Sequence, residues 1–177
     1  MVLSMAYRLI YPKRTYLIVS GRLGKEVNVM AADWVTVLSH KPTLIGVAVS
    51  PKRYTHKLVE KYGEYVIAVP GKNMLRDVWI AGSRSGPDKL SDMNITLIES
   101  KTVKTPSIKE ALANIECKVV AKNVYGDHTF FVGEITGYTF NEEVFNPSNY
   151  EPRNLTILIA HIARNKFTRF SNEILTP

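Results

Sequence analysis

Cysteine, long apolar runs and dense blocks of positive charge are all scarce in this sequence, and each absence excludes a class of protein. A single cysteine, Cys117, excludes an intramolecular disulfide and a cysteine-rich zinc site. The longest apolar run, residues 155–163, is broken by Thr156 and His161 and is far shorter than the ~20 residues of a membrane-spanning helix. Residues 1–11 also lack the continuous apolar core of a secretion signal. We therefore expect a cytoplasmic protein without membrane association.

The motifs of several large enzyme classes are missing as well. No G-x-G-x-x-G follows a strand signal and no G-x-x-x-x-G-K-[ST] occurs, so neither a Rossmann dinucleotide site nor a P-loop is predicted. The segment from Gly82 to Gly86 has the glycine spacing of a nucleophile elbow, but Arg84 stands where the nucleophile would be. The 4 histidines show no H-E-x-x-H or i, i+4 pairing, so we expect no metal site.

The net charge of +7 indicates an anionic partner but does not identify it. The 23 lysines and arginines are scattered along the chain, and no aromatic and basic motif of the RRM kind occurs. This distribution favours a phosphate-bearing small ligand or a merely solvated basic surface over nucleic acid.

Short β-strand signals dominate what is present. Runs rich in β-branched and aromatic residues, separated by Gly, Lys-Pro or Ser-Pro, predict strands at residues 16–20, 27–32, 34–38, 44–49, 65–69 and 95–98. Residues 114–122 and 129–138 flank a turn signal at 125–128 and are predicted to pair as a hairpin. Within the first of these, alternation places Cys117 on the apolar face beside Ile115 and Val119.

Helix signals are fewer. They predict helices at residues 55–62 and 74–81, the second with Asn73 as N-cap and Gly82 at C′, and a short helix at 108–112. Regular alternation of strands and helices, which a doubly wound sheet requires, is absent. We therefore expect one mainly β domain spanning residues 1–177, a closed or nearly closed antiparallel barrel with inserted helices.

Two strand ends combine small and polar residues. Residues 28–34 include Ala31 and Ala32, which allow a flat ring to approach the backbone; the alternative is a tight core contact beside Trp34. Residues 49–55 lead into a predicted helix with two hydroxyls and Arg53, a combination typical of an anion cradle. The alternative there is that Thr55 caps the helix and Arg53 lies in solvent.

Two loops add further candidates. Residues 82–89 carry two serines and two cations between glycines and can wrap a phosphate, or can be an ordinary connection. His128 stands at a strand entrance beside Phe130 and Phe131, where a histidine can donate or accept near neutral pH. The alternative is a turn histidine that faces water.

Taken in order, these segments resemble the flavin reductase family with the FMN-binding split barrel, and in particular its flavoredoxin and archaeal ferric reductase branch. The resemblance runs over residues 16–170. It rests on the segments 28–34, 42–53, 63–70, 82–90, 116–119 and 126–129. Residues 161–167 are similar to the family's closing segment, whereas the loop at 146–154 departs from its usual short connection.

The resemblance implies an FMN groove at the interface of a homodimer. It places the flavin ring along Met30, Ala31, Ala32, Asp33, Trp34 and Ser39. It places the ribityl chain and phosphate near Ser50, Arg53, Thr55, Ser83, Ser85 and Lys89. His128 is expected on the side from which the nicotinamide or the electron acceptor approaches.

The implied activity is transfer of a hydride from NADH or NADPH to the flavin, and of electrons onward to a flavin or ferric acceptor. One alternative is an FMN electron carrier that a partner protein reduces. A second alternative is a basic β-barrel that binds nucleic acid.

Overall fold

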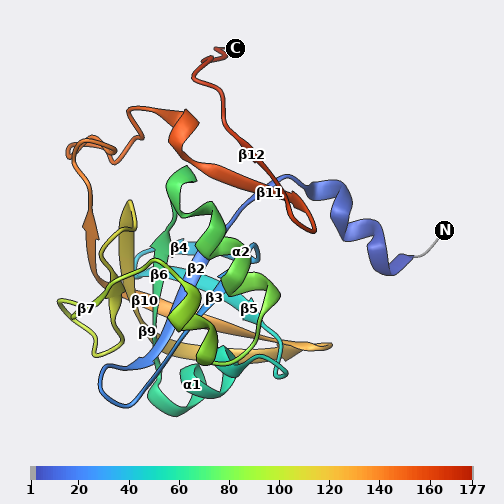
Figure 1. The fold of residues 1–177 in the computed structure, drawn as a ribbon, viewed down its shortest axis with the longest axis vertical. Helices are drawn as coiled ribbons and strands as arrows, with labels where there is room; N and C mark the ends of the chain where they lie inside the picture. Colours follow the sequence, from blue (N-terminus) through green and yellow to red (C-terminus); the bar gives the residue numbers. More distant parts are fainter. Residues whose placement is uncertain (1–2, 177) are drawn as a thin grey trace.

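A seven-stranded antiparallel sheet forms the centre of the computed structural model, which describes residues 3–176 (Figure 1). The strands follow the order β3-β2-β6-β9-β10-β5-β4. Their bounds are β2 (Tyr16–Arg22), β3 (Glu26–Ala32), β4 (Val35–His40), β5 (Thr43–Val49), β6 (Glu64–Val69), β9 (Ala113–Tyr125) and β10 (His128–Phe140). The expectation of a mainly β chain with inserted helices is confirmed, as is the hairpin, which turns at Gly126 with a positive φ of 61°.

The two edge strands of this sheet, β3 and β4, are consecutive in the chain and are joined by Asp33 and Trp34. Because the link is short, the sheet must curl until its two edges approach each other. Within the described residues 3–176, however, β3 and β4 are not hydrogen-bonded to each other, so the barrel is not closed. The Trp34 carbonyl accepts a hydrogen bond of 3.0 Å from the Ala48 amide, which fixes the link against β5. The barrel is therefore split where the chain crosses from one edge to the other.

Alternating residues along each strand supply two separate cores. Ile18 and Ile67 belong to the core inside the curl, whereas their neighbours Leu17 and Val66 belong to the core outside it. Cys117 is fully buried in the inner core, as the alternation predicted. Tyr65 spans the inner core and donates a hydrogen bond of 2.9 Å to the Ile45 carbonyl.

Two helices cover parts of the sheet. Helix α1 (Tyr54–Tyr62) ends at Gly63, whose left-handed φ of 64° suits glycine, and α2 (Leu75–Ser83) packs on β3 and β2 with Val78 and Ala81 in the outer core. The predicted caps of the second helix are wrong. Asn73 lies inside a preceding 3-10 turn, η2 (Lys72–Met74), and Gly82 lies within α2.

The predicted helix at residues 108–112 is also wrong. A short strand, β8 (Ser107–Ile108), stands at its start and pairs with β7 (Leu97–Ile98). The buried Asn114 side chain accepts from the Ile108 amide and donates to its carbonyl, both at 3.0 Å. These two hydrogen bonds hold the Ile108 backbone in the extended conformation of β8, so the local helix signal is overridden.

The terminal segments form a second, smaller sheet that the strand signals did not predict. Its order is β1-β11-β12, with β1 (Lys13–Arg14), β11 (Ile159–Ala163) and β12 (Lys166–Arg169). A 3-10 helix, η1 (Leu3–Ile10), precedes β1, and further 3-10 turns are η3 (Asp88–Asp92) and η4 (Leu155–Ile157). In Figure 1 η1 projects to the right of the molecule, whereas β12 runs upwards towards the C-terminus. Within residues 3–176, none of the helices is long and apolar enough to cross a membrane.

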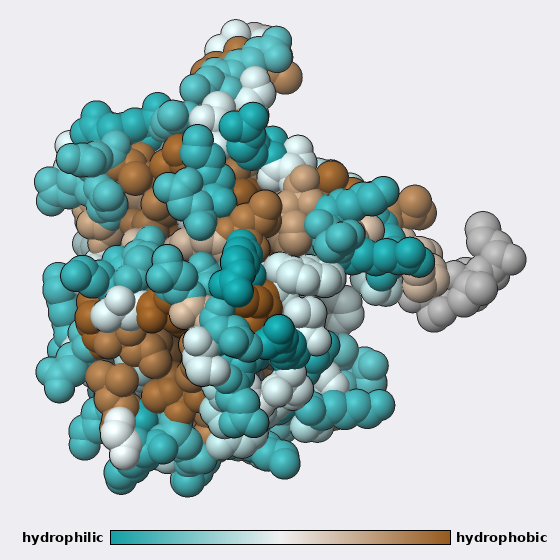
Figure 2. All heavy atoms as spheres, viewed as in Figure 1, coloured by the Kyte–Doolittle hydropathy of each residue, from teal (hydrophilic) through white to brown (hydrophobic). Residues whose placement is uncertain are grey.

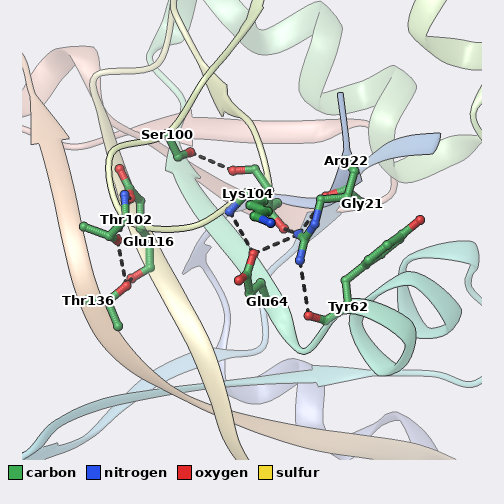
Figure 3. A network of polar contacts seen from close by, with 10 residues as sticks. Gly21, Arg22, Tyr62, Glu64, Ser100, Thr102, Lys104, Glu116 and Thr136 are labelled. Atoms are coloured by element: carbon green, nitrogen blue, oxygen red, sulfur yellow. Dashed lines mark hydrogen bonds and ion pairs between the residues drawn. The ribbon is translucent and has the colours of Figure 1, made fainter. Parts of the chain in front are cut away.

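Two buried or half-buried carboxylates hold the loop between β7 and β9 (Figure 3). Glu116 accepts from the Lys101 amide at 3.0 Å and from the amide and hydroxyl of Thr102 at 2.6 and 2.7 Å. Burial raises the pKa of Glu116, but these hydrogen bonds outweigh it and the pKa is lowered. Glu64 pairs with Arg22 at 2.8 Å and accepts from the Lys104 amide at 2.9 Å. The loop is therefore fastened to the sheet by charge-assisted bonds.

Candidate functional site

A cavity of about 260 Å³ lies at the split in the barrel, and we call it the split cavity. It is bounded by the end of β3, the end of β5, the turn of the β9–β10 hairpin and the two terminal segments. Eight of the residues predicted from the sequence line it: Met30, Ala31, Ala32, Asp33, Trp34, Ser50, Arg53 and His128. The fold thus brings together segments that are separated by almost one hundred residues in the chain.

The wall of the split cavity on the barrel side is made of small side chains. Ala31, Ala32 and Ala48 line it at the ends of β3 and β5. Their methyl groups leave room against the backbone, and β3 is an edge strand, so one side of its backbone is not paired within the sheet. Such a wall can accept a flat ring and hydrogen-bond to its polar edge.

His128 packs at the rim of this cavity. Its ring lies 4.7 Å from the Trp34 ring, centroid to centroid, with 43° between the planes, and Nδ1 is 2.7 Å from the Asp127 carboxylate. The hydrogen bond with His128 lowers the pKa of Asp127. The His128 side chain is 25% exposed, so it lies against the site and does not simply face water. An imidazole in this position can contact a second molecule that enters the cavity.

A polar cluster on the same cavity was not found by sequence reasoning. Asp33 Oδ2 is 2.7 Å from His161 Nδ1 and accepts from the Tyr11 hydroxyl at 3.1 Å, and Trp34 Nε1 donates to the Tyr11 oxygen at 3.2 Å. His161 Nε2 is 2.9 Å from the Arg164 carbonyl. Both ring nitrogens of His161 therefore lie within hydrogen-bond distance of an oxygen. Burial and the Asp33 carboxylate raise the pKa of Tyr11, although the hydrogen bond from Trp34 lowers it.

This cluster ties both terminal segments to the cavity. Tyr11 follows η1, and His161 lies on β11, which pairs with β1 at Lys13. Tyr11 and His161 are 22 and 128 residues from Asp33 in the chain. Local sequence patterns do not connect residues that are so far apart in the chain. The one signal that pointed to this region is the resemblance of residues 161–167 to the closing segment of the family.

The cationic side of the site lies at the start of α1. Arg53 is the N-cap residue of α1 in extended conformation, without a side-chain capping bond, and its side chain is exposed. Lys89 is 3% exposed and donates only to neutral acceptors, the Ala81 and Arg84 carbonyls at 3.1 and 3.0 Å. Burial, with a smaller contribution from the positive charge of Arg53, lowers the pKa of Lys89 to about 8. Over residues 3–176 neither cation forms an ion pair, so both positive charges lack an anionic partner.

Five predicted residues do not line the split cavity: Ser39, Thr55, Ser83, Ser85 and Lys89. Thr55 is fully buried and accepts a hydrogen bond of 2.7 Å from the Asn28 amide, so the alternative that it caps α1 is wrong. The Ser83 hydroxyl donates to the Trp79 carbonyl at 2.7 Å. Ser85 is exposed on the loop after α2, and Ser39 lies on β4 beside a register shift.

Known proteins share both the sequence and this architecture. The family model of the flavin reductase like domain matches residues 7–158. An uncharacterised protein from Pyrococcus abyssi is 58% identical over 168 residues, which cover 95% of this chain and 96% of that protein. An FMN-binding protein from Thermus thermophilus, crystallised with 1-cyclohex-2-enone, superposes with a TM-score of 0.86 at 25% identity and covers 97% of this chain and 93% of its own.

A flavoredoxin from Methanosarcina acetivorans superposes with a TM-score of 0.82 at 25% identity and covers 94% of this chain and 89% of its own. The expected fold class, the split barrel of FMN-binding flavin reductases, is thereby confirmed. Together with the match over residues 7–158, these findings confirm the resemblance read from the ordered segments, and the chain belongs to the flavin reductase like family.

Proposed function

We propose that this chain binds FMN in the split cavity and acts as a flavin reductase, with NADH or NADPH as hydride donor and a flavin or ferric complex as acceptor. The observation that carries the proposal is one juxtaposition. A wall of small residues that suits a flat ring lines the same cavity as Arg53, whose charge contributes to lowering the pKa of the buried Lys89; neither cation forms an ion pair within residues 3–176. A ring with a phosphate tail matches both features.

The residues fit FMN in the following roles. Met30, Ala31 and Ala32 would lie along the ring, with Asp33 and Trp34 at its edge. Ser50 and Arg53, which line the cavity, would contact the ribityl chain and the phosphate, and Lys89 would add the second charge. For Ser39, Thr55, Ser83 and Ser85 the proposal rests on the family resemblance. Thr55 would act indirectly, because its hydroxyl already holds Asn28.

FMN supplies the hydride and electron chemistry when it is bound. The protein's part is to exclude water, to place donors at the polar edge of the ring and to orient the second substrate. His128 is the residue we assign to that orientation, because it packs on Trp34 at the rim of the cavity and retains an exposed edge. The proposal requires no dedicated acid–base pair.

We further propose that the protein is a cytoplasmic homodimer in which the second copy covers the site. Apolar side chains are exposed next to it: Leu9 on η1 is 87% exposed and Val124 on the hairpin is 73% exposed. Figure 2 shows that apolar surface also gathers in patches among hydrophilic residues elsewhere on the face that it draws. Patches of this kind mark contact surfaces, and a symmetric pair is the commonest assembly. Sedimentation of the FMN-loaded protein as a monomer at micromolar concentration would reject the dimer.

A second candidate function, an FMN electron carrier reduced by a partner protein, is favoured by the similarity to a flavoredoxin. Anaerobic titration with NADH and NADPH separates the two functions. Rapid bleaching of the flavin absorbance by either nucleotide supports the reductase. A flavin that dithionite bleaches but neither nucleotide does supports the carrier, and a protein that retains no FMN contradicts both.

The role of His128 is tested in the same experiment with the variant His128→Ala. We expect unchanged FMN affinity and flavin reduction that is slower by roughly ten- to a hundredfold, the effect of losing one positioning contact of about 1–3 kcal/mol. His40→Ala, a change at an exposed histidine outside the cavity, is the control. A rate equal to wild type removes His128 from the reaction, and loss of FMN reassigns it to flavin binding.

A further inference from the structure

A second cavity, of about 680 Å³, shares no lining residue with the split cavity, and we call it the apolar cavity. Its volume falls within the range of roughly 300–1,000 Å³ that is usual for small-molecule sites. Its lining combines isoleucine side chains from four strands, a group of aromatic side chains and one arginine, Arg14. The proposed flavin function makes no use of this cavity.

The floor of the apolar cavity is aliphatic. Ile45, Ile67, Ile115 and Ile135 reach it from β5, β6, β9 and β10, four neighbouring strands of the large sheet. Ile45 and Ile67 belong to the inner core and Ile115 and Ile135 pack against it, so core packing holds the floor in place. An apolar ligand that packs on this floor would bury its surface away from water, and the protein would lose little conformational entropy on binding it.

One wall is an aromatic cluster at the end of β10 and in the loop that follows. The Phe140 ring lies 6.1 Å from Tyr138 at 23°, and 5.4 Å from Tyr150 at 87°. Tyr138 and Tyr150 are also linked by a hydroxyl–hydroxyl contact of 2.8 Å, yet both rings remain about half exposed. Tyr150 has a φ of 59°, a left-handed conformation that is unfavourable for a bulky residue. Backbone strain of this kind concentrates at binding sites.

Arg14 is the one charged side chain among the described residues that line the apolar cavity. Its guanidinium lies over the Tyr16 ring at 5.3 Å from the centroid. No hydrogen bond or ion pair from this guanidinium to an acceptor occurs within residues 3–176, and the buried Nε has no partner. A half-buried guanidinium without an acceptor is unfavourable, and a bound carboxylate would relieve it.

We propose that the apolar cavity binds a small aromatic carboxylic acid. The ring would pack against the aromatic wall over the aliphatic floor, and the carboxylate would meet the terminal nitrogens of Arg14, since Nε is closed off from solvent. Charge complementarity chooses this occupant: an uncharged arene would leave Arg14 unpaired, and a cation would be repelled by it. The site stands apart from the split cavity and does not depend on the flavin function.

The test uses two ligands of the same shape that differ in charge, 1-naphthylacetate and 1-naphthylacetamide, titrated calorimetrically into the full-length protein with FMN in excess. We expect the acid to bind at least about tenfold tighter than the amide, because only the acid can form a charge-assisted bidentate pair with Arg14. In Arg14→Met this ratio should fall to about one. Lys13→Met, a change at the neighbouring cation that does not line the cavity, should keep it. Tyr150→Leu should weaken both ligands alike.

Several results would overturn the proposal. These are equal affinity for acid and amide, a preference for the acid that survives in Arg14→Met, and absence of binding because a second copy of the chain covers the cavity. Displacement of FMN by the acid would place the ligand in the split cavity and would equally overturn it. Should Arg14→Met fail to fold, Arg14→Lys must give a ratio below that of wild type. None of these outcomes depends on reduction by NADH or NADPH, so the proposed function stands or fails separately.

Discussion

Lys89 offers the sharpest test of the proposed FMN site, because this buried amine has no anionic partner within residues 3–176. The buried Lys89 amine donates to two carbonyls. Burial, with a smaller contribution from the positive charge of Arg53, lowers the pKa of Lys89 from 10.5 to about 8. A displacement of this size corresponds to about 3 kcal/mol of stability, at 1.36 kcal/mol per pKa unit. Below pH 8 both the folded and the unfolded chain carry the charge, and the folded chain bears the penalty.

Between pH 8 and 10.5 the folded chain loses this proton while the unfolded chain keeps it, so stability rises with pH. We therefore expect the free energy of unfolding of flavin-free wild type, relative to Lys89→Met, to increase by about 3 kcal/mol across that interval. Chemical denaturation followed by tryptophan fluorescence at several pH values measures it. Lys72→Met, a change at an exposed lysine, is the control, and its free energy of unfolding should change with pH in the same way as that of wild type.

FMN should reverse the effect, because a phosphate beside Lys89 favours the charged amine. FMN affinity should then fall above pH 8 by up to about tenfold per pH unit, and binding near pH 9 should take up a proton, which calorimetry in two buffers detects. Riboflavin, which lacks the phosphate, should show neither effect. Parallel stability curves for wild type and Lys89→Met, or the same pH dependence for both flavins, would refute the reasoning.

Three further outcomes follow from other contacts. Arg53→Ala should weaken FMN by about 1.5–3 kcal/mol and riboflavin hardly at all; equal losses in equilibrium dialysis contradict the phosphate assignment. His161→Leu leaves the Asp33 carboxylate without its 2.7 Å partner and should lower the free energy of unfolding by about 1–3 kcal/mol, whereas the exposed His40→Leu should not. Glu116→Gln should cost about 1–3 kcal/mol at pH 7. Because the folded pKa of Glu116 lies below 4.5, that difference should shrink as pH falls through it, which acid denaturation beside the exposed Glu99→Gln control measures.

Local pattern was enough to predict most of the large sheet. The strands at residues 16–20, 27–32 and 65–69 were found because runs of β-branched and aromatic residues between turn signals favour extended backbone. The hairpin was found because Gly126 permits the positive φ of a tight turn. Helix ends were predicted less well. Asn73 and Gly82 have the right chemistry for caps, but the helix begins and ends where α2 packs on β3, so packing chose other residues.

The site was predicted in part for the same reason. Residues 30–34, Ser50, Arg53 and His128 lie at strand ends or turns, where local sequence carries a signal, and the fold gathers them around the split cavity. Tyr11 and His161 carry no such signal, because their partner Asp33 is distant in the chain and only the pairing of β1 with β11 brings them together.

What the sequence determined by itself is most of the short strands, the buried position of Cys117 and the family to which the chain belongs, since each depends on neighbouring residues or on their order. What only the tertiary structure decided is the meeting of distant groups. The tertiary fold brings the ends of β3 and β5 and the hairpin turn around one cavity, Arg53 close enough to Lys89 to affect its pKa, and Arg14 into one cavity with isoleucines of four strands. Those juxtapositions arise from packing and long-range hydrogen bonds, which no short window of residues encodes.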